Sequence, residues 1–320
     1  MTTDSPDSPD PTPTGSPPHD PAKKQASPPL LLRWLGLPKE AEVGAVMPVL
    51  VVACATVAPP LWEHVRTTFT DHTVVFWGTF FVSNGFYWGY SALMALLDLA
   101  EFPRALWRFK IQPAKKPTLA QYRKASARAL LLQVVVNLPL IVLLDRYLCQ
   151  WSGRNILAEE LPSPLELVKH LLVFAVIEEV GFYYGHRLLH SPRLYRLIHK
   201  KHHEFTAPIG VAATYAHPIE HLLSNLLPLI IGPLVMGSHI LVFWAWITIA
   251  QFTTINSHCG FYFPGFPTPL AHDYHHQVFN ANYGVLGILD GLHGTRGNFL
   301  RWQESWLSGV HVSETGKPRE

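Results

Sequence analysis

The sequence predicts an all-α integral membrane protein, in which four or more transmembrane helices carry a cytosolic, histidine-rich helical cap that holds a dimetal site. Charged residues make up only 15% of the 320 residues, well below the roughly 25% of soluble globular chains. Several long runs contain no Asp, Glu, Lys or Arg at all. Eighteen histidines are present, and most of them lie in short clusters in the second half of the chain.

The apolar runs place the transmembrane helices. A helix needs about 20 residues to cross about 30 Å of hydrocarbon, and soluble helices that are apolar on every face are rarely this long. Pro228, Gly232, Pro233 and Gly237 interrupt the longest run, which therefore predicts a hairpin of two helices. The runs are, in chain order, Val43–Trp62, Thr73–Leu97, the shorter Ala129–Leu144, Leu171–Tyr184 with Glu178 and Glu179 inside it, and Leu222–Ser257.

Basic residues predict the orientation of these helices. The segment Arg104–Arg128 carries eight Lys and Arg residues, and Gly185–His203 carries five. The other connections carry few basic residues. Because Lys and Arg concentrate in cytoplasmic loops, we expect both segments to face the cytosol. The net charge of only +2 argues against a nucleic-acid-binding protein.

Four regions follow from this pattern. Residues 1–29 form a Pro- and Ser-rich tail that we expect to be disordered, and they lack the apolar core of a signal peptide. Residues 30–165 form an N-terminal transmembrane region, residues 166–300 contain the histidine clusters, and residues 301–320 form a polar C-terminal tail. The three cysteines include no CxxC pair, so neither a disulfide framework nor a cysteine zinc site is expected.

The histidines recur at helical spacing. HRLLH places two histidines at i and i+4, and HKKHH and HDYHH each place three at i, i+3 and i+4, which is one face of a helix. Neutral imidazole is the commonest metal ligand, and a pH sensor needs far fewer histidines. The candidate ligands are His186, His190, His199, His202, His203, His258, His272, His275 and His276, while His217 and His221 beside Pro218 are expected either to bind metal or to cap a helix.

The number of histidines bears on the metal. A single zinc ion takes three or four protein ligands, so eight or more imidazoles fit two metals with five or six ligands each. Imidazole binds Fe, Zn, Cu and Ni alike, and ligand type alone does not choose among them. The Glu-x-x-His repeats of carboxylate di-iron bundles are absent.

The clusters HRLLH, HKKHH, AHPIEH and HDYHH, in this order, resemble those of the sterol desaturase / fatty acid hydroxylase superfamily of membrane non-haem di-iron oxygenases. The resemblance covers about Val168–Thr295. HKKHHEFTAPIG, YAHPIEH and SHCGFYFP are most similar to C-4 methyl sterol oxidases and to animal fatty acid hydroxylase domain-containing proteins.

The resemblance implies a function and a setting. Two irons, reduced by NAD(P)H through cytochrome b5 and its reductase, would use O2 to oxidise a C–H bond of a lipid in the endoplasmic reticulum membrane. No nucleic-acid partner is implied. The alternatives are a fatty acyl or sphingoid hydroxylase, a sterol C-5 desaturase, a non-catalytic sterol- or metal-binding protein and, most remote, a metal-dependent hydrolase.

Polar residues near the clusters are candidates for supporting the ligands. Glu179 lies seven residues before His186 on the same helix face, and we expect it to accept an imidazole N–H or to pair with a basic residue. Asp290 and His293 are expected to form a similar pair. Asp273 is a candidate for orienting the HDYHH histidines, and Asn282 is either a polar neighbour of the metals or a turn residue.

Overall fold

The computed structural model describes residues 59–151, 156–263 and 266–308, apart from the side chains of residues 150 and 151. In these residues the chain is helical or in loops, and one isolated bridge joins Lys110 and Phe261. The helices are η2 (Thr73–Gly78), α3 (Thr79–Ala100), α4 (Arg104–Trp107), α5 (Leu119–Leu132), η3 (Gln133–Asn137), α6 (Leu138–Arg146), η4 (Tyr147–Trp151), α7 (Pro164–Leu189), α8 (Pro192–Leu197), η5 (His199–Glu204), η6 (Gly210–Thr214), α9 (Pro218–Glu220), η7 (His221–Leu226), α10 (Leu227–Met236), α11 (Ile240–His258), α12 (Leu270–Val278), α13 (Ile288–His293) and α14 (Phe299–Leu307). Of these, η5 and η6 are 3₁₀ helices, and η2, η3, η4 and η7 are π-helical turns.

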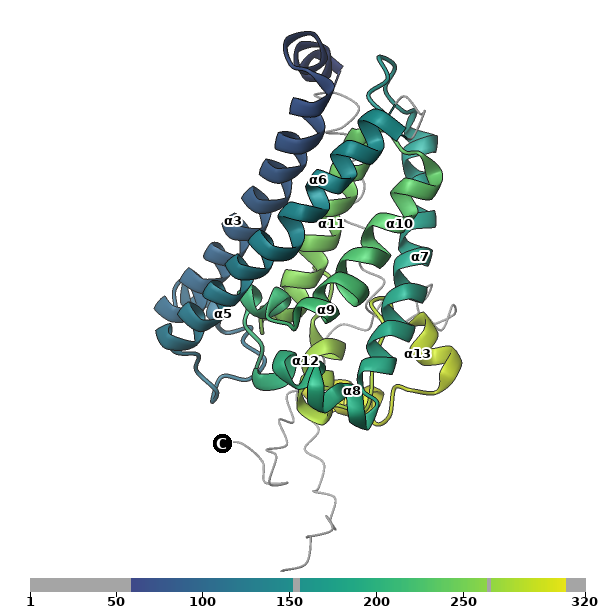
Figure 1. Cartoon of the computed structure of the whole chain (residues 1–320). Helices are drawn as coiled ribbons and strands as arrows, with labels where there is room; N and C mark the ends of the chain where they lie inside the picture. The colour runs from purple at the N-terminus through teal and green to yellow at the C-terminus, as the bar shows by residue number, and fades with distance from the viewer. Residues whose placement is uncertain (1–58, 152–155, 264–265, 309–320) are drawn as a thin grey trace, which may run out of the picture.

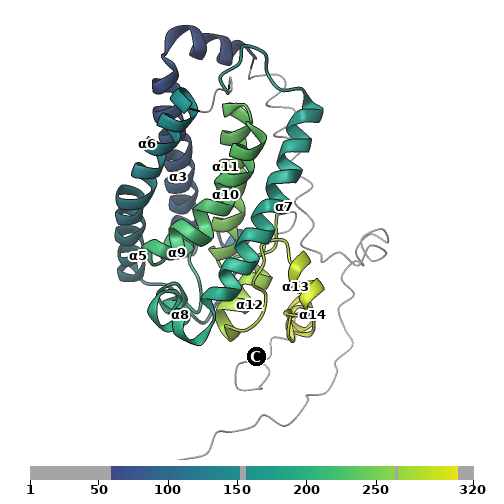
Figure 2. The same cartoon turned by 45° about the vertical axis from the view of Figure 1, so that its right-hand side comes forward.

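The long helices form a bundle. Figure 1 shows α3, the continuous α5–α6 rod, α7, the α9–α10 rod and α11 running along the long axis of the molecule. α10 packs on α7, and α11 packs on α3. The short helices α8, α12, α13 and α14 gather at one end of the bundle (Figures 1 and 2). The fold is therefore all-α, with a helical cap at one end, as the sequence predicts.

Local sequence signals explain where the helices begin and end. Thr118 and Ser163 form capping boxes at the starts of α5 and α7, which satisfy backbone N–H groups that lack a helical partner. Ser191 and Pro192 interrupt the helix, so that α7 ends and α8 begins there. Gly237 adopts φ +57° and ends α10, a backbone conformation that glycine adopts without a steric penalty. The predicted hairpin is therefore present, and its break lies at Gly237 rather than at the prolines.

Three helical segments are long and apolar enough to cross a membrane: Leu119–Cys149, Pro218–Met236 and Ile240–His258. The first contains the predicted run Ala129–Leu144, and the other two form the predicted hairpin. The helices over Thr79–Ala100 and Pro164–Leu189 also form, but they are not among these three segments. Most of the predicted run Val43–Trp62, the whole of the predicted tail 1–29 and residues 309–320 of the predicted C-terminal tail lie outside the described residues, whereas residues 301–307 belong to α14.

Close helix packing fixes α7 against α10. A Cβ on Gly232 would lie 2.8 Å from Cδ1 of Phe174 and 3.1 Å from its Cα, and a Cβ on Gly181 would lie 2.9 Å from Pro228. Small residues at such crossings let two helix backbones approach closely. α7 carries His186 and leads directly into His190, so this packing sets the position of both histidines relative to the hairpin.

The connection between α3 and α5 lies at the same end of the bundle as α8 (Figure 1). Lys110 in this connection is buried, and its Nζ lies 2.7 Å and 2.8 Å from the two carboxylate oxygens of Asp98 in α3. Tyr122 in α5 donates its hydroxyl to Asp98 at 3.0 Å. A buried ion pair with added hydrogen bonds tolerates little movement, so this end of the bundle is held firmly.

Candidate metal centre

Nine histidines from separate parts of the chain meet at the capped end of the bundle. α7 carries His186 in its last turn and is followed directly by His190, η5 supplies three imidazoles, α11 ends with His258, and α12 supplies three more. Each residue offers a ring nitrogen, and the nitrogens form two groups that can each hold a metal ion. The first group is His186, His190, His199, His203 and His275, and the second is His202, His258, His272 and His276.

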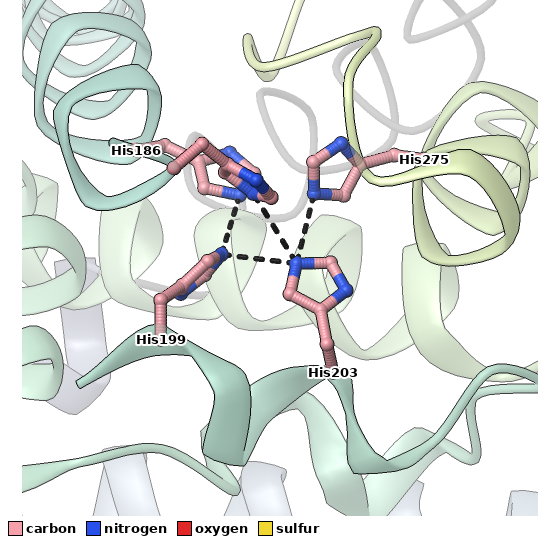
Figure 3. Close-up of side chains that lie close together, drawn as sticks. His186, His199, His203 and His275 are labelled. Atoms are coloured by element: carbon pink, nitrogen blue, oxygen red, sulfur yellow. Dashed lines mark hydrogen bonds between the residues drawn. The ribbon is translucent and has the colours of Figure 1, made fainter. Parts of the chain in front are cut away.

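In the first group the Nε2 atoms converge on one point (Figure 3). The Nε2 of His203 lies 3.0 Å from that of His199, 3.2 Å from that of His190 and 3.2 Å from that of His275. The Nε2 of His186 lies 3.1 Å from that of His199. Every member except His190 is buried.

The second group repeats this arrangement with four imidazoles. The Nε2 of His258 lies 2.9 Å from that of His272 and 3.3 Å from that of His202. The Nε2 of His276 lies 3.1 Å from that of His272. The two groups are adjacent, since the rings of His203 and His276 have centroids 4.7 Å apart.

The sequence clusters do not correspond to the two groups. Spacing predicts His199, His202 and His203 on one helix face, but they lie on a 3₁₀ helix, and His202 points to the second group. In α12, His272 and His276 lie in the second group and His275 in the first. Positions four apart differ by about 40° around an α-helix, whereas adjacent positions differ by about 100°, so α12 contributes to both groups. HKKHH is also divided between them, whereas both histidines of HRLLH belong to the first group.

The hydrogen bonds of the rings show that these groups fit metal ions. Three imidazoles donate their Nδ1–H to a backbone carbonyl. His186 donates to Tyr283 at 2.8 Å, His275 to Ala281 at 2.6 Å and His258 to Thr254 at 2.8 Å. A neutral imidazole has one donor nitrogen and one acceptor nitrogen. Each of these Nε2 atoms therefore carries a lone pair directed at other lone pairs about 3 Å away, an arrangement that a shared cation stabilises. All-nitrogen donors suit Fe, Zn, Cu or Ni rather than Mg or Ca.

Burial keeps these imidazoles neutral. It lowers the pKa of His190 to about 3, with His186 adding to the effect. Burial first, and neighbouring imidazoles second, also hold the pKa well below the usual range in His199, His202, His203, His272, His275 and His276. Neutral imidazole is the form that binds metal.

His217 and His221 lie outside both groups. His217 caps α9, and its Nδ1 accepts the backbone N–H of Ile219 at 3.3 Å. His221 begins the π turn η7, and its Nε2 lies 2.8 Å from Oδ1 of Asn137. The geometry therefore favours the capping alternative for His217 and a packing role between helices for His221.

Glu220 lies between these two histidines and contacts the first group directly. Its Oε1 accepts Nδ1–H of His199 at 2.8 Å, and both side chains are buried. A carboxylate behind a metal-binding imidazole fixes the ring and raises its basicity. Glu220 is not among the residues predicted from the sequence, although a signal was present: it is the last charged residue before the long uncharged stretch that ends at Asp273.

Glu179 supports the first group in a different way from the one expected. It contacts no imidazole, and its oxygens accept the backbone N–H groups of Val285 (2.9 Å), Leu286 (2.8 Å) and Leu289 (3.0 Å). The expected contact fails because the ring of His186 turns to the carbonyl of Tyr283 instead. Glu179 thus holds the segment whose carbonyl orients His186.

Asp290 shares that task and is not paired with His293. Its oxygens accept the backbone N–H groups of Tyr283 (2.9 Å) and Gly284 (2.7 Å) and the hydroxyl of Thr295 (2.6 Å). His293 is exposed, and its Nε2 lies 2.9 Å from the hydroxyl of Tyr184. The predicted pair is therefore wrong, because the Asp290 carboxylate is taken up by loop amides.

Asp273 and Asn282 lie near the groups without touching an imidazole. The Oδ1 atom of Asp273 accepts hydrogen bonds from Gln112 (2.9 Å) and Gln277 (2.7 Å), which fix α12. Asn282 has φ +57° and donates its side-chain N–H to the carbonyl of Ala271 at 3.1 Å. Asn282 is therefore the turn residue of the two alternatives.

A cavity of about 380 Å³ opens beside both groups. Five of the imidazoles line it, and so do Glu178 and Phe182, which precede His186 by two turns and one turn of α7. The remaining walls come from α11, η7, α14 and the segment that follows Asn282. Most of the lining is apolar, which suits the hydrocarbon part of a ligand.

Comparisons with known proteins agree with this site. Residues 171–295 match the sequence family described as Fatty acid hydroxylase. The chain is 44% identical over 238 residues to Fatty acid hydroxylase domain-containing protein 2 of Homo sapiens, covering 73% of this chain and 71% of the relative. It is 40% identical over 256 residues to Fatty acid hydroxylase ahd1 of Mycosarcoma maydis, covering 79% and 66%. It is 32% identical over 252 residues to Methylsterol monooxygenase 2-2 of Arabidopsis thaliana, covering 75% and 92%. No solved structure gives a significant match.

Proposed function

Because the chain belongs to the fatty acid hydroxylase family, whose members include lipid hydroxylases and monooxygenases, we propose that it is an O2-dependent membrane oxygenase with two non-haem irons. The observation that carries the proposal is the pair of all-imidazole groups at the wall of an apolar cavity. The nine histidines of the two groups would hold the metals. When bound, the irons would supply the activation of O2 for oxidation of a C–H bond.

The overall reaction fixes what else must be supplied. Hydroxylation of a lipid R–H by O2 gives R–OH and water, and it consumes two electrons and two protons. We propose cytochrome b5, reduced by NAD(P)H through its reductase, as the electron donor. Support comes from the basic residues of α8 and η5 beside the first group, among them the exposed Arg193, Arg196 and Lys200. We place this end in the cytosol and the protein in the endoplasmic reticulum membrane.

The side chains of the site have separate tasks in this proposal. Glu220 holds the ring of His199, and the carbonyls of Tyr283 and Ala281 hold those of His186 and His275. The apolar cavity binds the lipid and excludes water from the reacting carbon. A protein that positions neutral imidazoles before the metal arrives loses less free energy on metal binding.

We propose a 4-methyl sterol as the substrate, oxidised at the C-4 methyl group. The similarity of HKKHHEFTAPIG and YAHPIEH to methyl sterol oxidases supports this choice, as does the match with a methylsterol monooxygenase over 92% of the length of that relative. A fatty acyl or sphingoid chain is the second candidate, because the chain is 40% identical to a relative named fatty acid hydroxylase.

Metal analysis and lipid analysis test these proposals separately. The purified protein should contain about two irons per chain and should consume NADH only when O2, cytochrome b5 and its reductase are present. Zinc in place of iron, with activity that needs no O2, would point to a hydrolase. Bound iron without turnover on any lipid would point to a binding protein. Deletion of the gene should raise 4-methyl sterols, whereas unchanged sterols with altered 2-hydroxy acyl chains would favour the second candidate.

A further inference from the structure

The segment from Gly284 to Ile288 is a thin wall of the cavity. All five residues of this segment line the cavity. The first four form a loop, and Ile288 begins α13. The walls contributed by α7 and α11 are long helices packed on their neighbours. A loop separates from its surroundings at a lower cost than a packed helix does.

This segment and the helix that follows it carry exposed apolar side chains. Leu292 on α13 is 76% exposed, and Val285 and Ile288, which also line the cavity, are 41% and 54% exposed. α13 lies against the lower part of α7 (Figure 2). The exposed face of α7 adds Val180 and Tyr184 there, so one apolar surface continues from the helix onto the loop. A continuous apolar surface on a membrane protein fits the hydrocarbon of the bilayer.

Two buried carboxylates accept hydrogen bonds from the backbone of this segment and its immediate neighbours. Glu179 accepts the backbone N–H groups of Val285 and Leu286 in the loop and of Leu289 in α13, and Asp290 accepts those of Tyr283 and Gly284. Gly284 lies where both carboxylates approach, since a Cβ there would be 2.9 Å from Glu179 Oε1 and 3.0 Å from Asp290 Oδ2. Hydrogen bonds to a charged acceptor are roughly twice as strong as neutral ones. The three bonds to Glu179 attach this segment to α7, whereas those to Asp290 link it to α13.

We propose that the segment Gly284–Ile288 moves aside to let a lipid pass laterally from the bilayer into the cavity, and that Glu179 keeps this segment closed. The proposal rests on the proposed function, because it takes the ligand to be a membrane lipid. It adds the route, which runs between α7 and α13 where the capped end of the bundle meets the hydrocarbon of the bilayer. Glu179 is here a positioning residue that acts through the loop amides and does not touch the lipid.

Chemical access to the cavity tests the route without any turnover or bound metal. The full chain, with its three native cysteines replaced, carries the single change Ser224→Cys in liposomes. Ser224 is buried and lines the cavity on η7, so a thiol there nearly preserves its size. The probes are N-dodecylmaleimide, which partitions into the bilayer, and a charged maleimide that stays in water. Labelling rates are measured by mass spectrometry.

If the lipid enters from the bilayer through this segment, the rates of maleimide labelling should follow a defined pattern. The alkyl reagent should label the thiol faster than the charged one. Val285→Trp, which enlarges the wall, should slow labelling about tenfold, and Val285→Ala should speed it. Glu179→Gln should raise the labelling rate about tenfold, since it removes the charge that strengthens the hydrogen bonds from the backbone amides. Val176→Trp on the exposed face of α7 is the matched control and should leave the rate unchanged.

Three results would overturn the proposal. The first is equal rates for Val285→Trp and the Val176→Trp control. The second is labelling by the charged reagent as fast as by the alkyl reagent, which would place the opening in water. The third is no labelling of the Ser224→Cys chain in any variant, since the cavity would then be closed to the bilayer. Should Glu179→Gln fail to fold, the two Val285 variants decide alone. Loss of the oxygenase proposal leaves every labelling result standing, so the two failures are distinguishable.

Discussion

Replacing Glu220 by Gln tests how the first imidazole group is built. The Oε1 of Glu220 lies 2.8 Å from Nδ1 of His199, and both side chains are at most 3% exposed, so solvent screens the contact little. Glutamine has the same shape and still accepts the N–H, but it lacks the charge that raises the basicity of Nε2. Loss of such a partner weakens metal binding about 10- to 100-fold, which is about 1.4 to 2.8 kcal/mol.

The assay is competition between the purified protein and a chromogenic chelator, with Co(II) as the metal because its absorption reports the ligands. Glu204→Gln is the matched control. Glu204 follows His203 directly in sequence, yet its carboxylate points outward to Lys124 (2.6 Å) and Lys201 (3.1 Å). The reasoning is refuted if Glu220→Gln binds Co(II) as tightly as the wild type, or no more weakly than the Glu204→Gln control.

Three further outcomes follow from the structure. His203→Ala removes the nitrogen that contacts three others in the first group, so metal content by elemental analysis should fall from about two ions to about one, and two retained ions would contradict the grouping. Lys110→Met leaves the buried Asp98 carboxylate unpaired and should destabilise the protein by about 3 to 5 kcal/mol in thermal unfolding; adding Asp98→Asn should restore most of this, and failure to do so would show that the ion pair is not the cause. The metal-free protein should lose stability as the pH falls below about 6.5, because unfolded histidines then bind protons that the buried ones exclude, at up to about 1.4 kcal/mol per pH unit for each imidazole. Melting temperatures that are equal at pH 7 and pH 5 would contradict this; the imidazoles with lowered pKa are His190, His199, His202, His203, His272, His275 and His276.

Spacing and composition predicted much of this architecture. The uncharged run after Glu220 predicted a helical hairpin, which α10 and α11 form. Ser191 and Pro192 form a local helix-breaking signal, and the interruption after α7 lies there. The nine principal histidines gather in the two groups with none missing, and their metal binding stays a prediction. These successes share one cause, since periodicity and helix breakers act locally and leave a direct trace in the sequence.

The errors concern partners that only the folded chain brings together. Glu179 shares a helix face with His186, but same-face spacing does not reveal that a segment more than a hundred residues later supplies three amides to its carboxylate. The division of HKKHH between the two groups depends on whether it adopts 3₁₀ or α geometry, and its spacing is compatible with both. The pairing of Glu220 with His199 likewise depends on a contact between η5 and α9.

The π turn η7 has a consequence for how the chain tolerates insertions and deletions. A π turn accommodates one residue more than an α turn does, and η7 separates Glu220 from the membrane helix α10. Removing one residue between positions 221 and 226 would let the helix close into regular α geometry. The segments on either side would then keep nearly the same relative orientation, because the π turn already accommodates the extra residue, and Glu220 would still face His199. A frame-preserving loss of a single codon in η7 should therefore be tolerated better than the same loss in the regular helix α10, where it would rotate the two parts of the helix by about 100° relative to each other.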